Sequence, residues 1–302
     1  MIRSVIVTNY LDDSLEINLA RPEETGFLIT NISGLGPCKA TINMTDVATN
    51  DGSIYNSAKL NYRNIVMSIT FIGENIEKIR QLSYKYFPVK KDIRLEFVTD
   101  NRSCVATGYV ESNEPDIFSS AEATQISIIC PDAYFYSAKG NRYTTTFYGE
   151  EPLFTFPFSN ESLTEKLIKF GQINDVTDAV VYYLGDSEVG VKITIHAVGP
   201  ATGITIYNAR TREKMSIDTS KIETISGSAL GAGDDIIINT VKGEKSILLL
   251  RSGVYTNILN ALARDSDWFQ LSKGENVFAY TAETGITNLQ FKVENDIIYE
   301  GI

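Results

Sequence analysis

Most segments of the chain alternate apolar and polar residues with a period of two, and Gly, Asn, Asp and Ser separate these segments. Such alternation is typical of short antiparallel strands that bury one face, so we expect a mainly β protein. In residues 190–197, every second residue from Val191 to Ala197 is apolar and would share one face of a strand, whereas His196 falls on the other. Residues 236–250 predict a hairpin closed by a glycine-containing loop.

One segment of the first half has a helical period instead. In residues 74–87, the apolar Ile76, Ile79 and Leu82 recur at three-residue spacing, a glycine precedes the segment and a proline follows it. This pattern predicts an amphipathic helix. A helix lying on a membrane surface is the alternative, but three basic residues are too few to favour it over packing on a sheet.

The length of 302 residues favours two domains at about 150 residues each. A polar stretch near residues 136–141 gives the boundary, so we expect domains at 1–138, with the helix at about 74–87, and at 139–302. The second domain is predicted to be a β-sandwich with a short helix near Tyr255 to Arg264. Its expected strands lie near residues 153–158, 165–170, 179–184, 190–197, 203–207, 214–217, 234–240, 246–250, 277–280 and 287–293.

Charge and composition argue against several classes of function and location. The formal net charge of −11 opposes binding to nucleic acid, which requires clustered cations. The apolar stretch within residues 1–10 is too short for a secretory signal, so we expect the protein to stay in the cytoplasm. No later run approaches the roughly 20 apolar residues of a membrane helix. Three widely spaced cysteines, Cys38, Cys104 and Cys130, predict reduced, partly buried thiols.

No motif for catalysis, a cofactor or a metal ion stands out. His196 is the only histidine and is expected at the surface, and neither a nucleophile elbow nor zinc-ligand spacing is found. Paired carboxylates of a glycan hydrolase have no sequence signature, because they are defined by their separation in space. Aromatic residues of the second half are compatible with stacking on sugar rings, although core positions are favoured for them. They are Tyr182, Tyr183, Trp268 and Phe269.

Several short motifs, taken in their order and spacing, resemble the distal tail proteins of long-tailed bacteriophages. The first part has Ile32 to Gly36, Asp51 to Tyr55, Asn61 to Ile65, the helical segment and Cys130-Pro131-Asp132. The far end has Gly233-Asp234, Asn239-Thr240, Gly243, Ser246, Trp268-Phe269, Leu271, Gly274 to Asn276 and Tyr299 to Ile302. Ala133 departs from the pattern, because many members have a second proline there.

The resemblance implies a structural protein without enzymatic activity. It implies a six-fold homo-hexameric ring whose wall is a tail-tube-like β-barrel or sandwich domain with one packed helix, formed by sheets that continue between subunits. The second domain, a jelly-roll or galectin-like sandwich, would project outward. The ring would join the tail tube protein to the tail-tip hub, hold receptor-binding or adhesion proteins, and let DNA pass without binding it. The location implied is the virion tail tip, after assembly in the host cytoplasm.

Five residues are candidates for the ring or tube interface: Gly34, Gly36, Asp51, Gly52 and Arg63. Gly34 and Gly36 would permit close approach of two backbones, or would simply form a tight turn. Arg63 is either an intersubunit ion-pair partner or a solvated arginine at a strand end. The alternative function is a carbohydrate-binding module that recognises host cell-wall glycans through the second domain, and a glycan hydrolase ranks below it.

Overall fold

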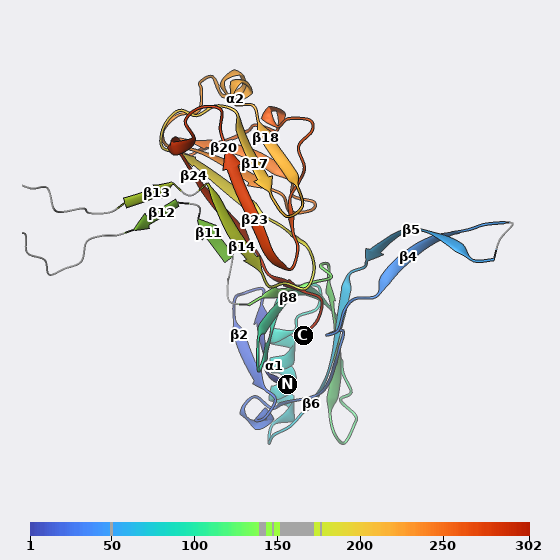
Figure 1. Cartoon of the computed structure of the whole chain (residues 1–302). Helices are drawn as coiled ribbons and strands as arrows, with labels where there is room; N and C mark the ends of the chain where they lie inside the picture. Colours follow the sequence, from blue (N-terminus) through green and yellow to red (C-terminus); the bar gives the residue numbers. More distant parts are fainter. Residues whose placement is uncertain (49–50, 139–142, 147, 152–171, 176) are drawn as a thin grey trace, which may run out of the picture. The chain divides into compact units, whose positions relative to one another are not determined.

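The computed structural model describes residues 1–48, 51–138, 143–146, 148–151, 172–175 and 177–302. The chain divides into two compact units, one of residues 1–141 with 298–302 and the other of residues 142–297 (Figure 1). The expectation of a mainly β protein is confirmed, since strands make up most of the elements of both units. Within the described residues, no helix is long and apolar enough to cross a membrane.

The first unit is built on one antiparallel sheet, in which seven strands lie side by side in the order β2-β1-β7-β8-β9-β6-β3. The strands are β1 (Ile2–Asn9), β2 (Ser14–Asn18), β3 (Phe27–Ser33), β6 (Arg63–Phe71), β7 (Asp92–Thr99), β8 (Ser103–Pro115) and β9 (Ala123–Cys130). A short 3-10 helix, Pro22–Glu24, lies between β2 and β3. Among the described residues no ladder joins β2 to β3, so the sheet is open and is not a closed barrel.

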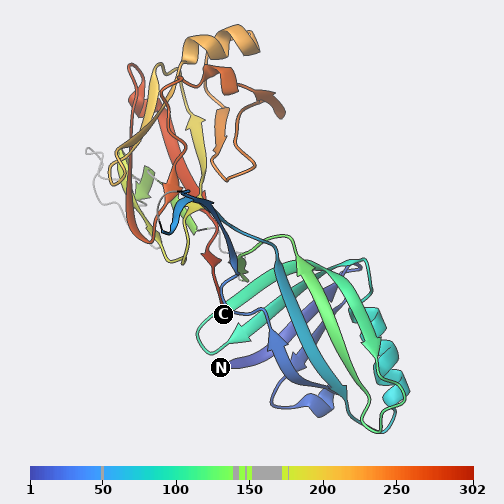
Figure 2. The ribbon, with the colours of Figure 1, turned by 90° about the vertical axis from the view of Figure 1, so that its right-hand side faces the viewer.

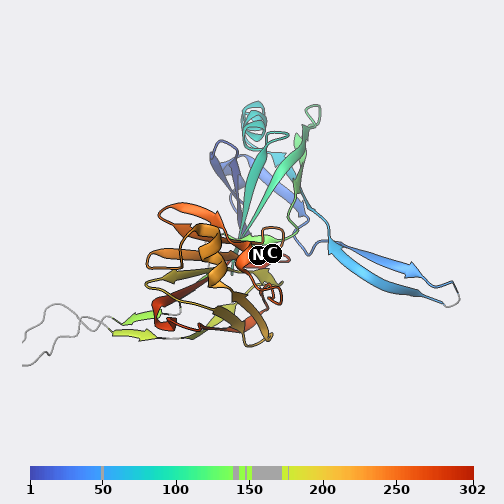
Figure 3. The same cartoon turned by 90° about the horizontal axis from the view of Figure 1, so that it is seen from above.

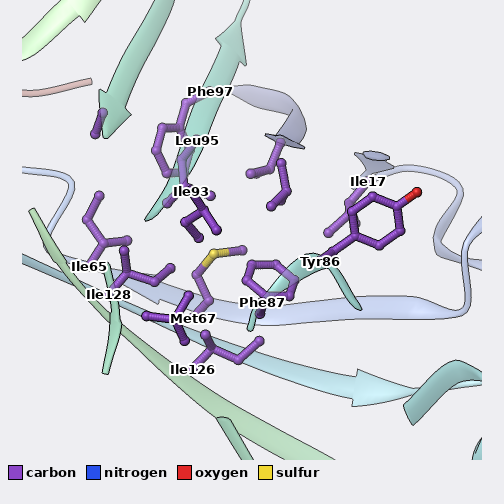
Figure 4. Packing of buried hydrophobic residues seen from close by; sticks show 14 of the residues in the cluster. Ile17, Ile65, Met67, Tyr86, Phe87, Ile93, Leu95, Phe97, Ile126 and Ile128 are labelled. Atoms are coloured by element: carbon purple, nitrogen blue, oxygen red, sulfur yellow. The ribbon is translucent and has the colours of Figure 1, made fainter. Parts of the chain in front are cut away.

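The core of the first unit lies between this sheet and the helix α1 (Ile76–Tyr86). The helix predicted over residues 74–87 is therefore confirmed, and Figure 2 shows it alongside the sheet. The Asn75 side chain caps its first turn by accepting a hydrogen bond from the Lys78 amide. Met67 and Ile126 from the sheet and Phe87 after the helix are fully buried in this core (Figure 4).

Two strands of the first unit lie outside the main sheet. β4 (Ala40–Asp46) and β5 (Ser53–Leu60) pair only with each other and form a hairpin, here called the arm. Figure 3 shows the arm extending away from the strands of the main sheet. In the sequence the arm lies between β3 and β6, which pair with each other at one edge of the main sheet. Both ends of the arm, here called its roots, therefore join the first unit at that edge.

The second unit is a β-sandwich. One sheet has the order β11-β24-β16-β19-β20-β21, the other β14-β23-β17-β18, and β12-β13 and β15-β22 form two small ladders. Tyr280 on β23 stacks on Phe291 on β24 at a centroid distance of 3.7 Å, which joins the two sheets in the core. The strands are β11 (Tyr143–Thr146), β12 (Tyr148–Glu151), β13 (Gln172–Asp175), β14 (Asp178–Tyr183), β15 (Val189–Gly190), β16 (Lys192–Ala197), β17 (Ile204–Asn208), β18 (Glu213–Ile217), β19 (Asp234–Asn239), β20 (Ser246–Arg251), β21 (Val254–Asn257), β22 (Gln270–Leu271), β23 (Gly274–Thr281) and β24 (Leu289–Asn295).

Most of the strands expected in this unit are found, and the β19–β20 hairpin pairs as expected. The two expected near 153–158 and 165–170 lie outside the described residues. The helix expected near Tyr255 to Arg264 is wrong: strand β21 and a 3-10 helix, Leu259–Ala261, occupy this segment. A helix that was not expected, α2 (Thr219–Ser226), begins at an Asp218 cap and ends at Gly227. A further 3-10 helix spans Ile286–Asn288.

The last five residues of the chain belong to the first unit, although we expected them in the second domain. β25 (Ile298–Tyr299) pairs with β10 (Phe135–Ser137), which in turn pairs with β8 of the main sheet. We call residues 298–302 the C-terminal strap. The first unit therefore contains both ends of the chain.

Candidate assembly surface

The arm has one apolar face. Ile42 and Met44 are two residues apart on β4 and point to the same side, and the pairing of Met44 with Tyr55 places the tyrosine there too. These three side chains are 53%, 59% and 62% exposed. Ala40, Ala58 and Leu60 complete the same face. An apolar face of this size on a hairpin is normally covered by another surface.

The opposite face of the arm is mostly polar, although the exposed Ile54 lies on it opposite Thr45, and it carries hydrogen bonds between side chains of the two strands. Asn43 donates to the Ser57 hydroxyl at 2.9 Å. Asn56, the extra residue of a bulge, donates to Thr45 at 2.6 Å. The arm is thus an amphipathic hairpin, and its two faces differ as the faces of a half-buried sheet do.

At the root of the arm, Arg63 is buried and acts as a hydrogen-bond donor to the backbone. Its side chain is only 2% exposed, and its guanidinium lies 4.0 Å from the centre of the Phe135 ring. It donates to the carbonyls of Gly34 and Gly36 on one root of the arm. It also donates to the carbonyl of Ala133, at 2.7 and 3.1 Å.

The alternative of a solvated arginine at a strand end is wrong, because the Arg63 side chain is buried, and the intersubunit ion pair stays a prediction. Burial lowers the pKa of the Arg63 guanidinium from its usual value. Burial also raises the pKa of the nearby Cys130 thiol to about 11, so this thiol is neutral near pH 7. The cation is therefore held by carbonyl dipoles and by the face of an aromatic ring.

The C-terminal strap ends at the same place. Arg63 donates to the carbonyl of Glu300 at 2.8 Å, and Arg102 donates to that of Gly301 at 2.8 Å. The Ile302 amide donates to the Leu35 carbonyl at 3.0 Å, between the two glycines of the arm root. The Arg63 guanidinium thus binds three segments together: the root of the arm, the β9–β10 connection and the C-terminal strap.

The five predicted interface residues separate into two groups. Gly34, Gly36 and Arg63 come together at the root of the arm. The close backbone approach expected at Gly34 occurs within the chain, because a Cβ there would lie 2.0 Å from the Asn64 carbonyl oxygen. Asp51 and Gly52 are exposed at the tip of the arm. The alternation within residues 40–46 and 53–60 was the available signal for the apolar face that sequence analysis missed.

The main sheet offers two further surfaces. Its outermost strands, β2 and β3, each pair with one neighbour only among the described residues, so each leaves a free edge. Its face opposite α1 is mixed: the residues that alternate with the buried ones include the polar Asn64, Thr107, Gln125 and Ser127 and also Val66, Ile129 and the exposed Tyr109. This face also carries carboxylates, as at Glu111, which accepts a hydrogen bond from Ser127.

The aromatic residues singled out in the second unit have different environments. Tyr183 and Phe269 are buried, as expected for core positions, and Trp268 is half-buried with Lys245 5.1 Å from its ring centre. Tyr182 is exposed. His196 is half-exposed and its Nδ1 lies 2.7 Å from an oxygen of Asp235, in agreement with the surface position expected.

Comparison with known proteins identifies a family match within the second unit. Residues 184–294, which cover the sandwich from the end of β14 into β24, match the family described as "Siphovirus-type tail component, C-terminal domain". This match lies within the second unit and covers less than half of the chain. The resemblance inferred from the sequence motifs is thereby confirmed for the second unit.

One solved structure extends the likeness of fold to both units. The Dit protein of phage SPP1 aligns with a TM-score of 0.62 at 12% identity, over 97% of this chain and 98% of that chain. The whole chain therefore shares the SPP1 protein's fold. A chain of the phage P2 baseplate in its activated conformation aligns with a TM-score of 0.46 at 13% identity, over 100% of both chains. No curated protein sequence matches the chain.

Proposed function

We propose that this tail component forms a closed ring, with six copies, at the tip of the phage tail. The ring joins the tail tube to the tail-tip hub, anchors receptor-binding or adhesion proteins, and leaves a conduit for the genome. Its role is architectural and involves no catalysis. It is assembled in the cytoplasm of the host bacterium. The observation that carries the proposal is the amphipathic arm, whose apolar face is exposed in the single chain.

The arm supports assembly because it needs a partner surface. A two-stranded hairpin alone is marginally stable in water, and packing its apolar face on a second copy would remove Ile42, Met44 and Tyr55 from solvent. If the arm packs on a different part of the next copy, the contact is head-to-tail. Such a contact generates a ring when the rotation between copies closes.

The free edges of the main sheet support the same arrangement. β2 and β3 lie at opposite ends of the strand order, so pairing of β2 in one copy with β3 in the next would continue the sheet around the ring. Closure would leave no free edge at these two strands. The expectation of sheets that continue between subunits is thus compatible with the strand order.

The face of the main sheet opposite α1 supports the conduit. Its hydroxyl, amide and carboxylate groups, together with the net charge of −11, provide no cluster of cations that would retain DNA phosphates. The tail-tip position is supported by the SPP1 protein of like fold, which is described as a paradigm of hub adsorption apparatus in phages that infect Gram-positive bacteria.

The arm is tested by placing a charge on either of its faces. In the full chain, Ile42→Asp puts a carboxylate on the apolar face, and the matched control Thr45→Asp puts one on the polar face. We expect sedimentation velocity to show loss of the ring in the first variant and its retention in the second. Equal assembly of both variants would contradict the role of the arm.

A further inference from the structure

The second unit carries an uncovered aromatic face that the ring does not explain. On β14, Val181 and Tyr183 point into the sandwich, so Val180 and Tyr182 point outward. Tyr182 is 56% exposed. The outward side continues across the sheet through Val277 on β23, which pairs with Val180, to Tyr207 on β17.

Polar groups lie at one end of this face, beside Tyr182. The guanidinium of Arg210 is fixed by two hydrogen bonds that its Nη1 donates to the carbonyls of Lys273 and Glu275, at 3.0 and 2.8 Å. The Arg210 amide donates to the buried side chain of Asn208, which fixes the backbone as well. The guanidinium is therefore held in place before any ligand arrives.

Three groups at this end keep unused hydrogen-bonding capacity. Among the described residues, the Tyr182 hydroxyl, the Glu275 carboxylate and the remaining nitrogens of Arg210 have no hydrogen-bond partner. Tyr182 and Glu275 are directly paired across β14 and β23. With Arg210, Ala209 and Val277 they line an open depression of about 680 Å³.

The charges around the depression cancel. Lys273 forms an ion pair with Asp186 at 3.1 Å. Arg210 and Glu275 carry opposite charges, and neither is paired to another ionised side chain among the described residues. An anionic ligand would be repelled by Glu275 and a cationic one by Arg210, so the balance favours a neutral ligand rich in hydroxyl groups.

We propose that this depression binds a pyranose unit of a neutral glycan. The ring of Tyr182 supplies an apolar platform for one face of the sugar. Arg210 donates hydrogen bonds to one sugar hydroxyl, and Glu275 accepts one from its neighbour, because each hydroxyl both donates and accepts. An aromatic side chain with a few convergent polar groups is the usual composition of a small-ligand site. The site is independent of the ring and would give the tail component a direct contact with saccharides.

The test uses the full-length protein and a panel of D-glucose, D-galactose, L-rhamnose and N-acetyl-D-glucosamine, each titrated in the millimolar range and followed by saturation-transfer NMR. We expect saturable binding of at least one sugar. Tyr182→Ala and Glu275→Gln should each weaken it at least tenfold. Tyr255→Ala is the matched control, since this tyrosine on β21 is 61% exposed and lies on the other sheet of the same unit.

Three results would overturn the glycan site: no saturable binding of any sugar, equal effects of Tyr182→Ala and Tyr255→Ala, or binding confined to a polyanion such as poly(glycerol phosphate). Thermal unfolding of each variant shows whether it is folded, and substitution at exposed positions is expected to leave the melting temperature within about 2 °C. Sedimentation of the Tyr182→Ala variant separates this proposal from the ring, because ring size should not change.

Discussion

The guanidinium of Arg63 donates a hydrogen bond to the backbone carbonyl of Glu300, 237 positions later in the chain, at 2.8 Å. Through it, the C-terminal strap is tied to Gly34 and Gly36 at the root of the arm. A residue at the start of β6 thus sets the position of the arm relative to the main sheet.

Arg63→Met, which keeps the length of the side chain but removes its donors, is expected to lower the free energy of unfolding of the first unit by about 3–5 kcal/mol. The reason is that four carbonyls, on the exposed Gly34, Gly36 and Glu300 and the half-buried Ala133, lose a charged donor, and a hydrogen bond to a charged group contributes about 1.5–3 kcal/mol. Urea unfolding followed by circular dichroism measures the loss. Arg3→Met is the control, since Arg3 is exposed and pairs only with the exposed Asp100. Similar losses in both variants would contradict the proposed role of Arg63.

The two glycines at the arm root should respond differently to substitution by alanine. Gly34 has φ +82° and its added Cβ would meet the Asn64 carbonyl oxygen at 2.0 Å, so Gly34→Ala must displace the backbone and is expected to cost more than about 2 kcal/mol. Gly36→Ala meets no atom within 4 Å and should change stability little. Thermal unfolding of the pair gives the comparison, and an equal effect at both positions would be inconsistent with the geometry.

Lowering the pH should weaken a second arginine contact, the one between Arg251 and Asp234 in the sandwich. Asp234 accepts hydrogen bonds from Arg251 Nε and Nη2 at 2.8 and 2.6 Å, and this contact, followed by the Gly231 amide, lowers the pKa of the Asp234 carboxyl. A carboxyl with a depressed folded pKa stabilises the fold above its unfolded pKa of about 3.9, and the contribution is lost as the pH falls through the folded value.

Asp234→Asn should therefore be less stable than the unsubstituted protein at pH 7, by about 1–3 kcal/mol for the lost charge-assisted bonds. The difference should shrink when urea unfolding is repeated below pH 4. The comparison within one pH removes the effect of the exposed carboxylates, which titrate in both proteins. A difference that is unchanged across this range would show that Asp234 is not stabilised as a carboxylate.

Apolar periodicity within a short segment predicted those strands and helices that bury one face. The alternation in residues 190–197 predicted strand β16, and the spacing of Ile76, Ile79 and Leu82 predicted α1. The segment from Tyr255 failed as a helix because β21 gains its stability by pairing with β20, which no short window of sequence reports. α2 was missed because its eight residues have little apolar periodicity.

The candidate site was harder to predict, because its partners are backbone groups far away in the chain. Arg63 looked like a surface arginine, since its acceptors are carbonyls and leave no mark on the identity of the residues that supply them. The strap pairs through only two residues, which is too short for a period-two pattern. The exposed tyrosine of the sandwich was distinguished from its buried neighbour only by the register of β14.

The central claim, a closed ring of this chain, is tested most directly by counting copies. Native mass spectrometry of the full-length protein, with negative-stain imaging of the same sample, gives both stoichiometry and symmetry. We expect six copies of the 33.5 kDa chain and six-fold averages with a central opening. A monomer at every concentration, also in the presence of the purified tail tube protein, or an open filament would contradict it.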